Sequence, residues 1–187
     1  MSHLRRRRAV IILFAITSGI GLVTLVGLRL AGLLIPYSSP TDSMAPALRK
    51  GDQFLMEGIT YHFHKPRRGD LVVFTLPDPN QPGVIYVKRL IGLPGETLRI
   101  SDGKLYVNDK LVTLNNRDGE INFSQKVQFK YLPEGGGFTI PDGHYFVIGD
   151  NLEHSADSRS WGPLPAGNLM GRVAYIFGPW EDAGAPK

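Results

Sequence analysis

The sequence predicts a mostly β domain that follows a single N-terminal membrane-spanning helix. Residues 9–28 form an uncharged, apolar run that is about long enough to cross the hydrocarbon core of a bilayer. From residue 36 onward, short runs rich in β-branched and aromatic residues alternate with glycine and proline turns. Outside the apolar run, few segments show the 3.6-residue hydrophobic period that a helix requires.

The apolar run is interpreted as an uncleaved anchor over residues 9–35, interrupted by Arg29. A cleaved signal peptide, the competing interpretation, has an apolar core of only about 7–15 residues. Residues 1–8 are basic, with arginine at positions 5–8. By the positive-inside rule, these residues stay in the cytoplasm and the domain over 36–177 lies on the other side of the membrane.

The expected strands follow one another through the domain. They cover residues 53–57, 70–75, 84–91, 97–100, 104–107, 111–114, 126–131, 138–140, 144–148 and 171–177. Asp102-Gly103 and Asn108-Asp109 are dipeptides typical of tight hairpin turns, so the region from 97 to 114 is predicted to be a β-meander. Residues 178–187 are small and polar and are expected to form a flexible tail.

Composition excludes several classes of function. The net charge of +4 comes largely from the arginine cluster beside the apolar run, which does not indicate a nucleic-acid partner. The chain has no cysteine, which excludes disulfides, thiolate catalysis and cysteine-bound zinc. His62 and His64 would share one face of a strand, but no third ligand follows them, so no metal is expected.

A proline-rich segment after the apolar run is a candidate nucleophile loop. Pro40 and Pro46 restrict the backbone, and Gly51-Asp52 closes the segment, so a rigid loop is expected rather than a helix. Ser43 lies between the two prolines, where a rigid loop would hold its hydroxyl in place. The competing interpretation is a linker in which Ser43 is merely polar.

The expected strand over 84–91 carries two basic residues among apolar ones. Strand alternation places Lys88 on one face and Arg89 on the other. A desolvated lysine can lose its proton, whereas arginine stays charged, so Lys88 is the candidate base. The competing interpretation is an edge strand whose lysine reaches into solvent.

A third polar segment runs from Gly149 to Gly162. It crowds hydroxyls and carboxylates into one loop, and Asp157 with Arg159 is expected to form a structural ion pair. His154 is the histidine that a Ser-His-Asp triad would recruit. A solvated turn without function is the competing interpretation.

Together these segments resemble the type I signal peptidases, a family of membrane-anchored Ser/Lys proteases. The resemblance rests on Ser43-Met44-Ala45-Pro46-Ala47-Leu48 with Gly51-Asp52, on residues 68–74, on residues 86–96, and on Gly149-Asp150-Asn151 with residues 155–159 and Trp161-Gly162. Each segment alone is a weak signal, but four in this order behind an apolar run are specific. Thr41 and Leu152 depart from the family, which commonly has serine and arginine at these positions.

The resemblance implies a signal-peptidase-type β-fold with a small β insert and no metal or organic cofactor. It implies that Ser43 is the nucleophile, Lys88 the general base and Ser155 the residue that orients the lysine. The Ser43 N–H and the Thr41 hydroxyl would bind the oxyanion. Asp157 and Arg159 are implied to be structural support, and the residues expected to line shallow substrate pockets are Met44, Leu48, Tyr86 and Val87.

The implied reaction is removal of signal peptides from secreted preproteins by an enzyme in the bacterial cytoplasmic membrane. Membrane lipid is then the other expected partner. The alternatives are a hydrolase that uses His154 as base and a self-cleaving, repressor-type Ser/Lys protease, which would lack an anchor. An inactive membrane-tethered domain that binds peptides, and a peptidase dedicated to one substrate, also remain open.

Overall fold

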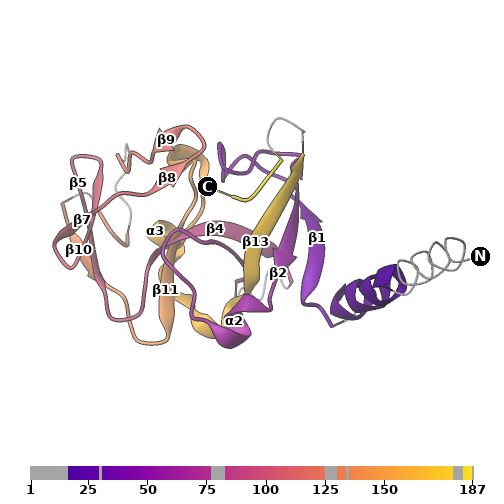
Figure 1. The fold of residues 1–187 in the computed structure, drawn as a ribbon. Helices are drawn as coiled ribbons and strands as arrows, with labels where there is room; N and C mark the ends of the chain where they lie inside the picture. The colour runs from indigo at the N-terminus through magenta and orange to yellow at the C-terminus, as the bar shows by residue number, and fades with distance from the viewer. Residues whose placement is uncertain are drawn as a thin grey trace, which may run out of the picture.

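The computed structural model describes residues 17–29, 31–76, 83–124, 130–133, 135–178 and 183–186. In these residues the strands form a seven-stranded sheet, a four-stranded sheet and a two-stranded ribbon. The elements are arranged as a β-domain from which one N-terminal helix projects (Figure 1). The prediction of a mostly β domain is confirmed.

The seven-stranded sheet has the order β1-β2-β13-β3-β4-β11-β12. Its strands are β1 (Leu34–Ser38), β2 (Gln53–Glu57), β3 (Leu71–Thr75), β4 (Ile85–Gly92), β11 (His144–Ile148), β12 (Leu164–Pro165) and β13 (Leu169–Gly178). All neighbours pair antiparallel, and β13 lies between β2 and β3. The last strand of the chain is therefore central in the sheet.

The smaller sheet is the expected β-meander with one added strand. It contains β5 (Thr97–Ser101), β6 (Lys104–Val107), β7 (Lys110–Val112) and β10 (Gly137–Thr139), and β8 (Asn115–Asn116) pairs with β9 (Gly119–Glu120) beside it. Both predicted hairpin turns have positive φ at their two central residues: 52° and 70° at Asp102 and Gly103, and 49° and 61° at Asn108 and Asp109. This is the geometry of a type I′ turn.

Short helices occupy places where none was expected. They are α2 (Thr60–Phe63), α3 (Ser158–Trp161) and two 3₁₀ turns, Leu152–His154 and Ala166–Asn168. Helix α2 begins at Thr60, whose backbone N–H donates to the Glu57 carboxylate at 2.9 Å. His62 therefore lies in a helix and does not share an extended strand with His64, which the sequence alone allowed.

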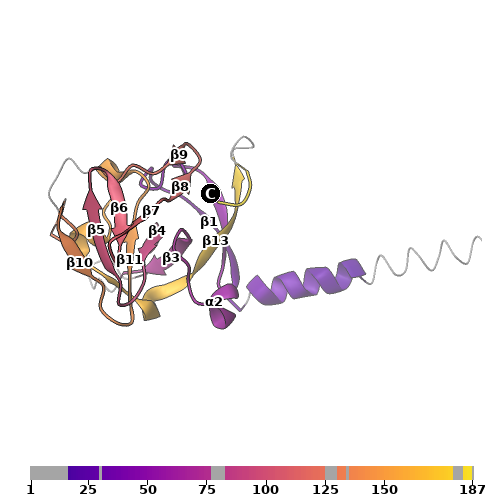
Figure 2. The same cartoon turned by 60° about the vertical axis from the view of Figure 1, so that its left-hand side comes forward.

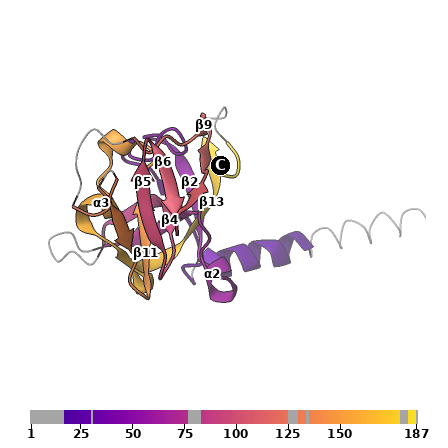
Figure 3. The same ribbon diagram turned by 90° about the vertical axis from the view of Figure 1, so that its left-hand side faces the viewer.

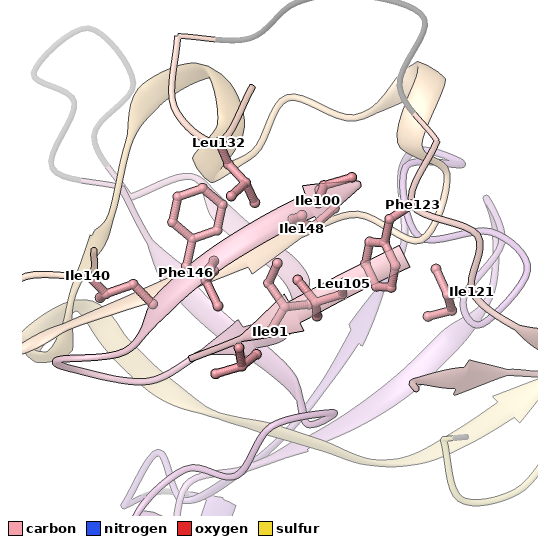
Figure 4. Packing of buried hydrophobic residues seen from close by; sticks show 11 residues of the cluster. Ile91, Ile100, Leu105, Ile121, Phe123, Leu132, Ile140, Phe146 and Ile148 are labelled. Carbon is pink, nitrogen blue, oxygen red and sulfur yellow. The ribbon is translucent and has the colours of Figure 1, made fainter. Parts of the chain in front are cut away.

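Three hydrophobic clusters hold the domain together. In the first, the small sheet packs against β4 and β11 through buried aliphatic and aromatic side chains such as Ile91, Leu105 and Phe146 (Figure 4). The second packs Met44, Ala47 and Leu48 against side chains of β2, β3 and β13. The third is built from β3, β4, β11 and β12. The second cluster fixes the candidate nucleophile loop, because three of its own residues are in the core.

Residues 17–29 are the described part of the N-terminal helix, and residues 9–16 and 30 of the expected anchor lie outside the described part of the chain. Among the described residues, no helix is long and apolar enough to span a membrane. The end of the expected anchor is also different, because Leu34 and Ile35 pair with β2 as the start of β1. The apolar character of these two residues serves a sheet edge rather than a helix.

Two further expectations fall at the margins of the described structure. Residues 126–129 of one expected strand lie outside it, and Lys130 and Tyr131 are not in a strand. In the tail, which was expected to be flexible, Gly184 returns to β13 and exchanges two backbone hydrogen bonds with Ile176, at 2.8 and 2.9 Å. β3 pairs with β13 only up to Arg172, which leaves that side of Ile176 available to the tail.

Candidate active site

The structure brings Ser43 and Lys88 into direct contact. Ser43 Oγ lies 2.7 Å from Lys88 Nζ, although the residues are 45 positions apart in the sequence. The serine comes from the loop between β1 and β2, and the lysine comes from β4, where Val72 is its partner on β3. Turns and a Met44–Leu48 bridge shape the loop, as its prolines predicted.

Lys88 is almost entirely buried, with 3% of its surface exposed. Burial lowers the pKa of its amine from 10.5 to about 8, because the interior disfavours the charged form. Asp157 opposes this change and Arg159 reinforces it. A substantial fraction of the amine is therefore neutral at moderately alkaline pH and able to accept a proton.

Thr41 extends this pair by a second hydroxyl. Thr41 Oγ1 donates a hydrogen bond to Ser43 Oγ at 3.2 Å, and the Ser43 N–H approaches Thr41 Oγ1 at 3.5 Å. The backbone N–H of Ser43 is thus only weakly engaged. The hydroxyl of Thr41 and this amide are both close to the nucleophile, and each is a hydrogen-bond donor of the kind that stabilises an oxyanion.

Asp157 and Arg159 form the predicted ion pair at the base of the third segment. Both side chains have no exposed surface, and Arg159 Nη2 lies 2.8 Å from Asp157 Oδ2. The same carboxylate accepts the backbone N–H groups of Gly149 and Arg159, at 3.0 and 3.2 Å. These contacts hold the loop after β11 in a single shape.

The loop after β11 is attached to both catalytic candidates. The backbone N–H and side-chain amide of Asn151 donate to the carbonyls of Ser43 and Asp42, each at 3.2 Å. Asp150 accepts two hydrogen bonds from Arg89 at 2.7 Å, and Arg89 is the neighbour of Lys88 on β4. One loop therefore positions the serine segment and the lysine strand together.

Ser155 and Leu152 complete this loop in different ways. Ser155 is buried, and its Oγ has no hydrogen-bond partner among the described residues, so the structure contains no bond from it to Lys88. Leu152, which departs from the family pattern, packs against the first hydrophobic cluster, and its carbonyl accepts Arg159 Nη2 at 2.9 Å. The backbone at position 152 thus supports the ion pair without a charged side chain.

A cleft of about 510 Å³ opens beside Ser43 and Lys88. Its walls include three of the residues expected to bind substrate: Met44, Tyr86 and Val87. Leu48, the fourth, is absent from these walls and fully buried in the second hydrophobic cluster, where it anchors the loop instead. His154 also lines the cleft and is exposed to solvent.

Several cleft residues were missed from the sequence. Tyr37 and Phe54 face each other across β1 and β2, with ring centroids 5.8 Å apart, and both line the cleft. Tyr37 was missed because no strand was predicted between the expected anchor, which ended at residue 35, and residue 53. Ile85 could have been predicted to line the cleft, because strand alternation places it on the same face as Val87.

Comparison with known proteins gives a consistent result. The family described as "Signal peptidase, peptidase S26" matches residues 9–180. A probable signal peptidase I-1 of Synechocystis sp. is 36% identical over 163 residues, which cover 80% of this chain and 76% of the relative. Signal peptidase I of Bacillus licheniformis is 34% identical, over 86% of this chain and 85% of the relative.

A plant relative and a solved structure match as well. The chloroplastic thylakoidal processing peptidase 1 of Arabidopsis thaliana is 33% identical, over 84% of this chain and 46% of its own length. The crystal structure of a signal peptidase I from Enterococcus faecalis matches with a TM-score of 0.45 and 32% identity, over 58% of this chain and 97% of that one.

Proposed function

Because this chain belongs to the peptidase S26 family of signal peptidases, we propose that its serine endopeptidase activity uses Ser43 as nucleophile and Lys88 as general base. The chain is a signal-peptide-removing serine peptidase. The observation that carries the proposed dyad is the 2.7 Å contact between Ser43 Oγ and the buried Lys88 Nζ.

In the first half of the reaction, Ser43 Oγ attacks the carbonyl carbon of the scissile peptide and its proton passes to neutral Lys88. A pKa of about 8 suits this step, because an appreciable fraction of the amine is then neutral at neutral to mildly alkaline pH. The carbonyl oxygen becomes an oxyanion, which the Ser43 N–H and the Thr41 hydroxyl stabilise by hydrogen bonds. For this, Thr41 exchanges its bond to Ser43 Oγ for one to the oxyanion.

In the second half, protonated Lys88 gives its proton to the leaving amine as the peptide bond breaks. A water molecule then attacks the acyl-enzyme, Lys88 accepts a proton from it, and Ser43 recovers its hydroxyl hydrogen when the product carboxylate leaves. We propose that Ser155 orients the Lys88 amine. Its hydroxyl is buried and has no partner among the described residues, so it is available to the amine when the substrate engages Ser43. Asp157 and Arg159 support the loop that carries Ser155.

The substrates are preproteins whose signal peptides end in small residues. The cleft beside Ser43 is lined mostly by apolar side chains, including Tyr37, Ile85 and Val87, and a polypeptide in extended form fits beside the strands that carry them. Met44 and Tyr86 would contact the side chains before the cleavage site. Neither nucleic acid nor a metal ion takes part in this mechanism.

The proposed location is the bacterial cytoplasmic membrane, with residues 1–8 in the cytoplasm and the β-domain outside it. The apolar run over 9–28 supports an anchor, and its residues 17–27 are all exposed, with Ile20, Leu22 and Val23 showing more than half of their surfaces. Such side chains exposed side by side on a helix need an apolar environment.

The test is incubation of the purified full chain in detergent with a preprotein, followed by mass spectrometry of the new N-terminus. The wild type is expected to cut once, after a small residue. Ser43→Ala and Lys88→Ala are each expected to reduce the rate at least about 10³-fold, since they remove the nucleophile or its base. Lys104→Ala, an exposed lysine on β6, is the matched control and keeps full activity.

Full processing by Lys88→Ala would contradict the dyad. Loss of processing in His154→Ala alone would instead favour a histidine base, since His154 lines the same cleft. If the wild type made no cut, the domain would be a peptide-binding module.

A further inference from the structure

Helix α2 and the loop after it form an exposed basic surface that the reaction does not use. Phe63, the last residue of α2, has 78% of its surface exposed. Its neighbours His62, His64, Lys65 and Arg67 are exposed as well. An exposed aromatic ring beside basic side chains is a combination typical of surfaces that lie at a membrane interface.

The same segment lines a polar hollow of about 290 Å³. Its walls are Thr60, Tyr61, His64, Lys65, Arg67, Asp70 and Arg172. Three of these residues are permanent cations and one is a carboxylate, so the hollow carries a net positive charge.

The acidic groups near the hollow are already engaged elsewhere. Asp70 accepts the Tyr61 hydroxyl at 2.8 Å and the Arg67 backbone N–H at 2.9 Å. Glu57 pairs with Arg172 at 2.5 Å. Within the described part of the chain, Lys65 and Arg67 have no ion-pair partner, so their charges are available to an external anion.

The surface lies next to the end of the N-terminal helix. The described part of the helix runs to residue 29, and the Leu33 carbonyl, four residues later, accepts the Gly58 N–H at 3.0 Å, two residues before α2 begins. Figures 2 and 3 show α2 beside the end of this helix from two directions. If the helix crosses a bilayer, α2 lies where the headgroups are.

We propose that the α2 surface, which comprises Phe63, Lys65, Arg67 and the hollow behind them, binds the headgroups of anionic phospholipids. The proposal rests on the membrane anchor proposed above. Phe63 enters the boundary between headgroups and acyl chains, where aromatic rings are favoured. Lys65 and Arg67 pair with lipid phosphates, and their aliphatic stems lie along the acyl boundary.

A second attachment beside the anchor would restrict the orientation of the catalytic domain. A single helix leaves the domain free to rotate and tilt over the membrane. Contact through α2 removes much of this freedom and holds the Ser43 cleft at one height above the bilayer, where a tethered preprotein presents its cleavage site.

The absence of cysteine makes a direct test available, because one introduced thiol can be labelled uniquely. The full chain carrying Phe63→Cys is labelled with an environment-sensitive fluorophore and reconstituted into phosphatidylcholine vesicles with or without phosphatidylglycerol. We expect blue-shifted, brighter emission only where phosphatidylglycerol is present. Leu111→Cys, on the small sheet and 54% exposed, is the matched control, and its label stays in water on both vesicles.

Charge removal tests the role of the cations. Lys65→Gln with Arg67→Gln is expected to abolish most of the emission change at position 63. Lys104→Gln with Lys110→Gln, two exposed lysines of the small sheet, is expected to leave it unchanged.

Emission at position 63 that stays water-like on both vesicles overturns the proposal, and so does equal burial on both, which needs no anionic headgroup. Calorimetric binding of inorganic phosphate to the detergent-solubilised chain, without any emission change on vesicles, would assign the hollow to free phosphate instead.

Flotation with vesicles tests the anchor separately. A chain that floats with a water-exposed label contradicts the lipid site alone, and a chain that does not float contradicts both the lipid site and the anchor. Preprotein cleavage in detergent monitors the dyad independently.

Discussion

The two basic residues of β4 are both buried, but one contacts a carboxylate and the other contacts a hydroxyl. Arg89 meets Asp150 in a two-pronged ion pair that is 3% and 1% exposed, so its charge is compensated. Lys88 has a serine hydroxyl rather than a carboxylate against its amine, and burial lowers its pKa to about 8. The same strand thus holds a structural cation and a potential base side by side.

Thr41 provides a test of oxyanion stabilisation at the residue scale. Thr41→Val keeps the shape of the side chain but removes the hydroxyl, and kcat is expected to fall about 10²–10³-fold, as for other oxyanion donors. Thr41→Ser keeps the hydroxyl and is the matched control, with activity close to wild type. Steady-state cleavage of a preprotein measures both, and an unchanged kcat in Thr41→Val would remove Thr41 from the oxyanion site.

Asp157 is expected to matter for stability more than any exposed carboxylate. Asp157→Ala removes the carboxylate that compensates the charge of the fully buried Arg159, and we expect the free energy of unfolding to fall by about 3–5 kcal/mol. Glu120→Ala is the control, because Glu120 is an exposed carboxylate on β9. Denaturant unfolding followed by fluorescence compares the two, and similar losses would contradict the structural role of Asp157.

At the scale of elements, Gly149 is where the loop after β11 packs most closely against the serine loop. A Cβ at this position would lie 2.2 Å from Ser155 Oγ and 2.4 Å from the Ser43 carbonyl oxygen, closer than such atoms can approach. Gly149→Ala must therefore push the loop after β11 away from the serine loop.

We expect Gly149→Ala to lower kcat about 10²-fold, because displacements of about 1 Å have such effects on a catalytic pair. Gly167→Ala is the control, since a Cβ there meets no atom within 4 Å. Initial rates of preprotein cleavage compare the two variants, and wild-type activity in Gly149→Ala would show that the packing of these loops is not needed for catalysis.

Element prediction succeeded where the signal was local. The hairpin turns at Asp102-Gly103 and Asn108-Asp109 were correct, because positive φ is a property of the turn residues themselves. β1 was missed because an apolar edge strand directly after an apolar helix has no change of composition to mark its start. The pairing of Gly184 with β13 was missed because it depends on the place where β3 ends, which only the assembled sheet defines.

The same distinction applies to the candidate site. Ser43 and Lys88 were proposed from residue type and local pattern, and the structure places them in contact. The predicted ion pair of Asp157 with Arg159 spans only two positions. The partner of Arg89 was not found, because Asp150 is 61 positions away and only the antiparallel pairing of β4 with β11 brings them together. Leu48 was assigned to the cleft because an apolar residue beside a nucleophile suits a pocket wall and the core equally well.

At the scale of the whole molecule, the sheet brings together the proposed catalytic residues from distant segments. Ser43 precedes β2, Lys88 is on β4, and the supporting loop follows β11, so the site exists only when the domain is folded. The N-terminal helix leaves from β1, one strand before the nucleophile, which links the proposed anchor to the cleft through a short and direct path (Figure 1).

The pH dependence of kcat/KM tests the Ser43–Lys88 account most directly. Only the neutral amine accepts the serine proton, so the active fraction falls as pH decreases through the pKa of Lys88. We predict that kcat/KM rises about tenfold per pH unit below pH 8 and levels off above the pKa of about 8. His154→Ala is expected to keep this profile. A profile that levels off near the ordinary histidine pKa of about 6.5, and that His154→Ala abolishes, would contradict Lys88 as the base.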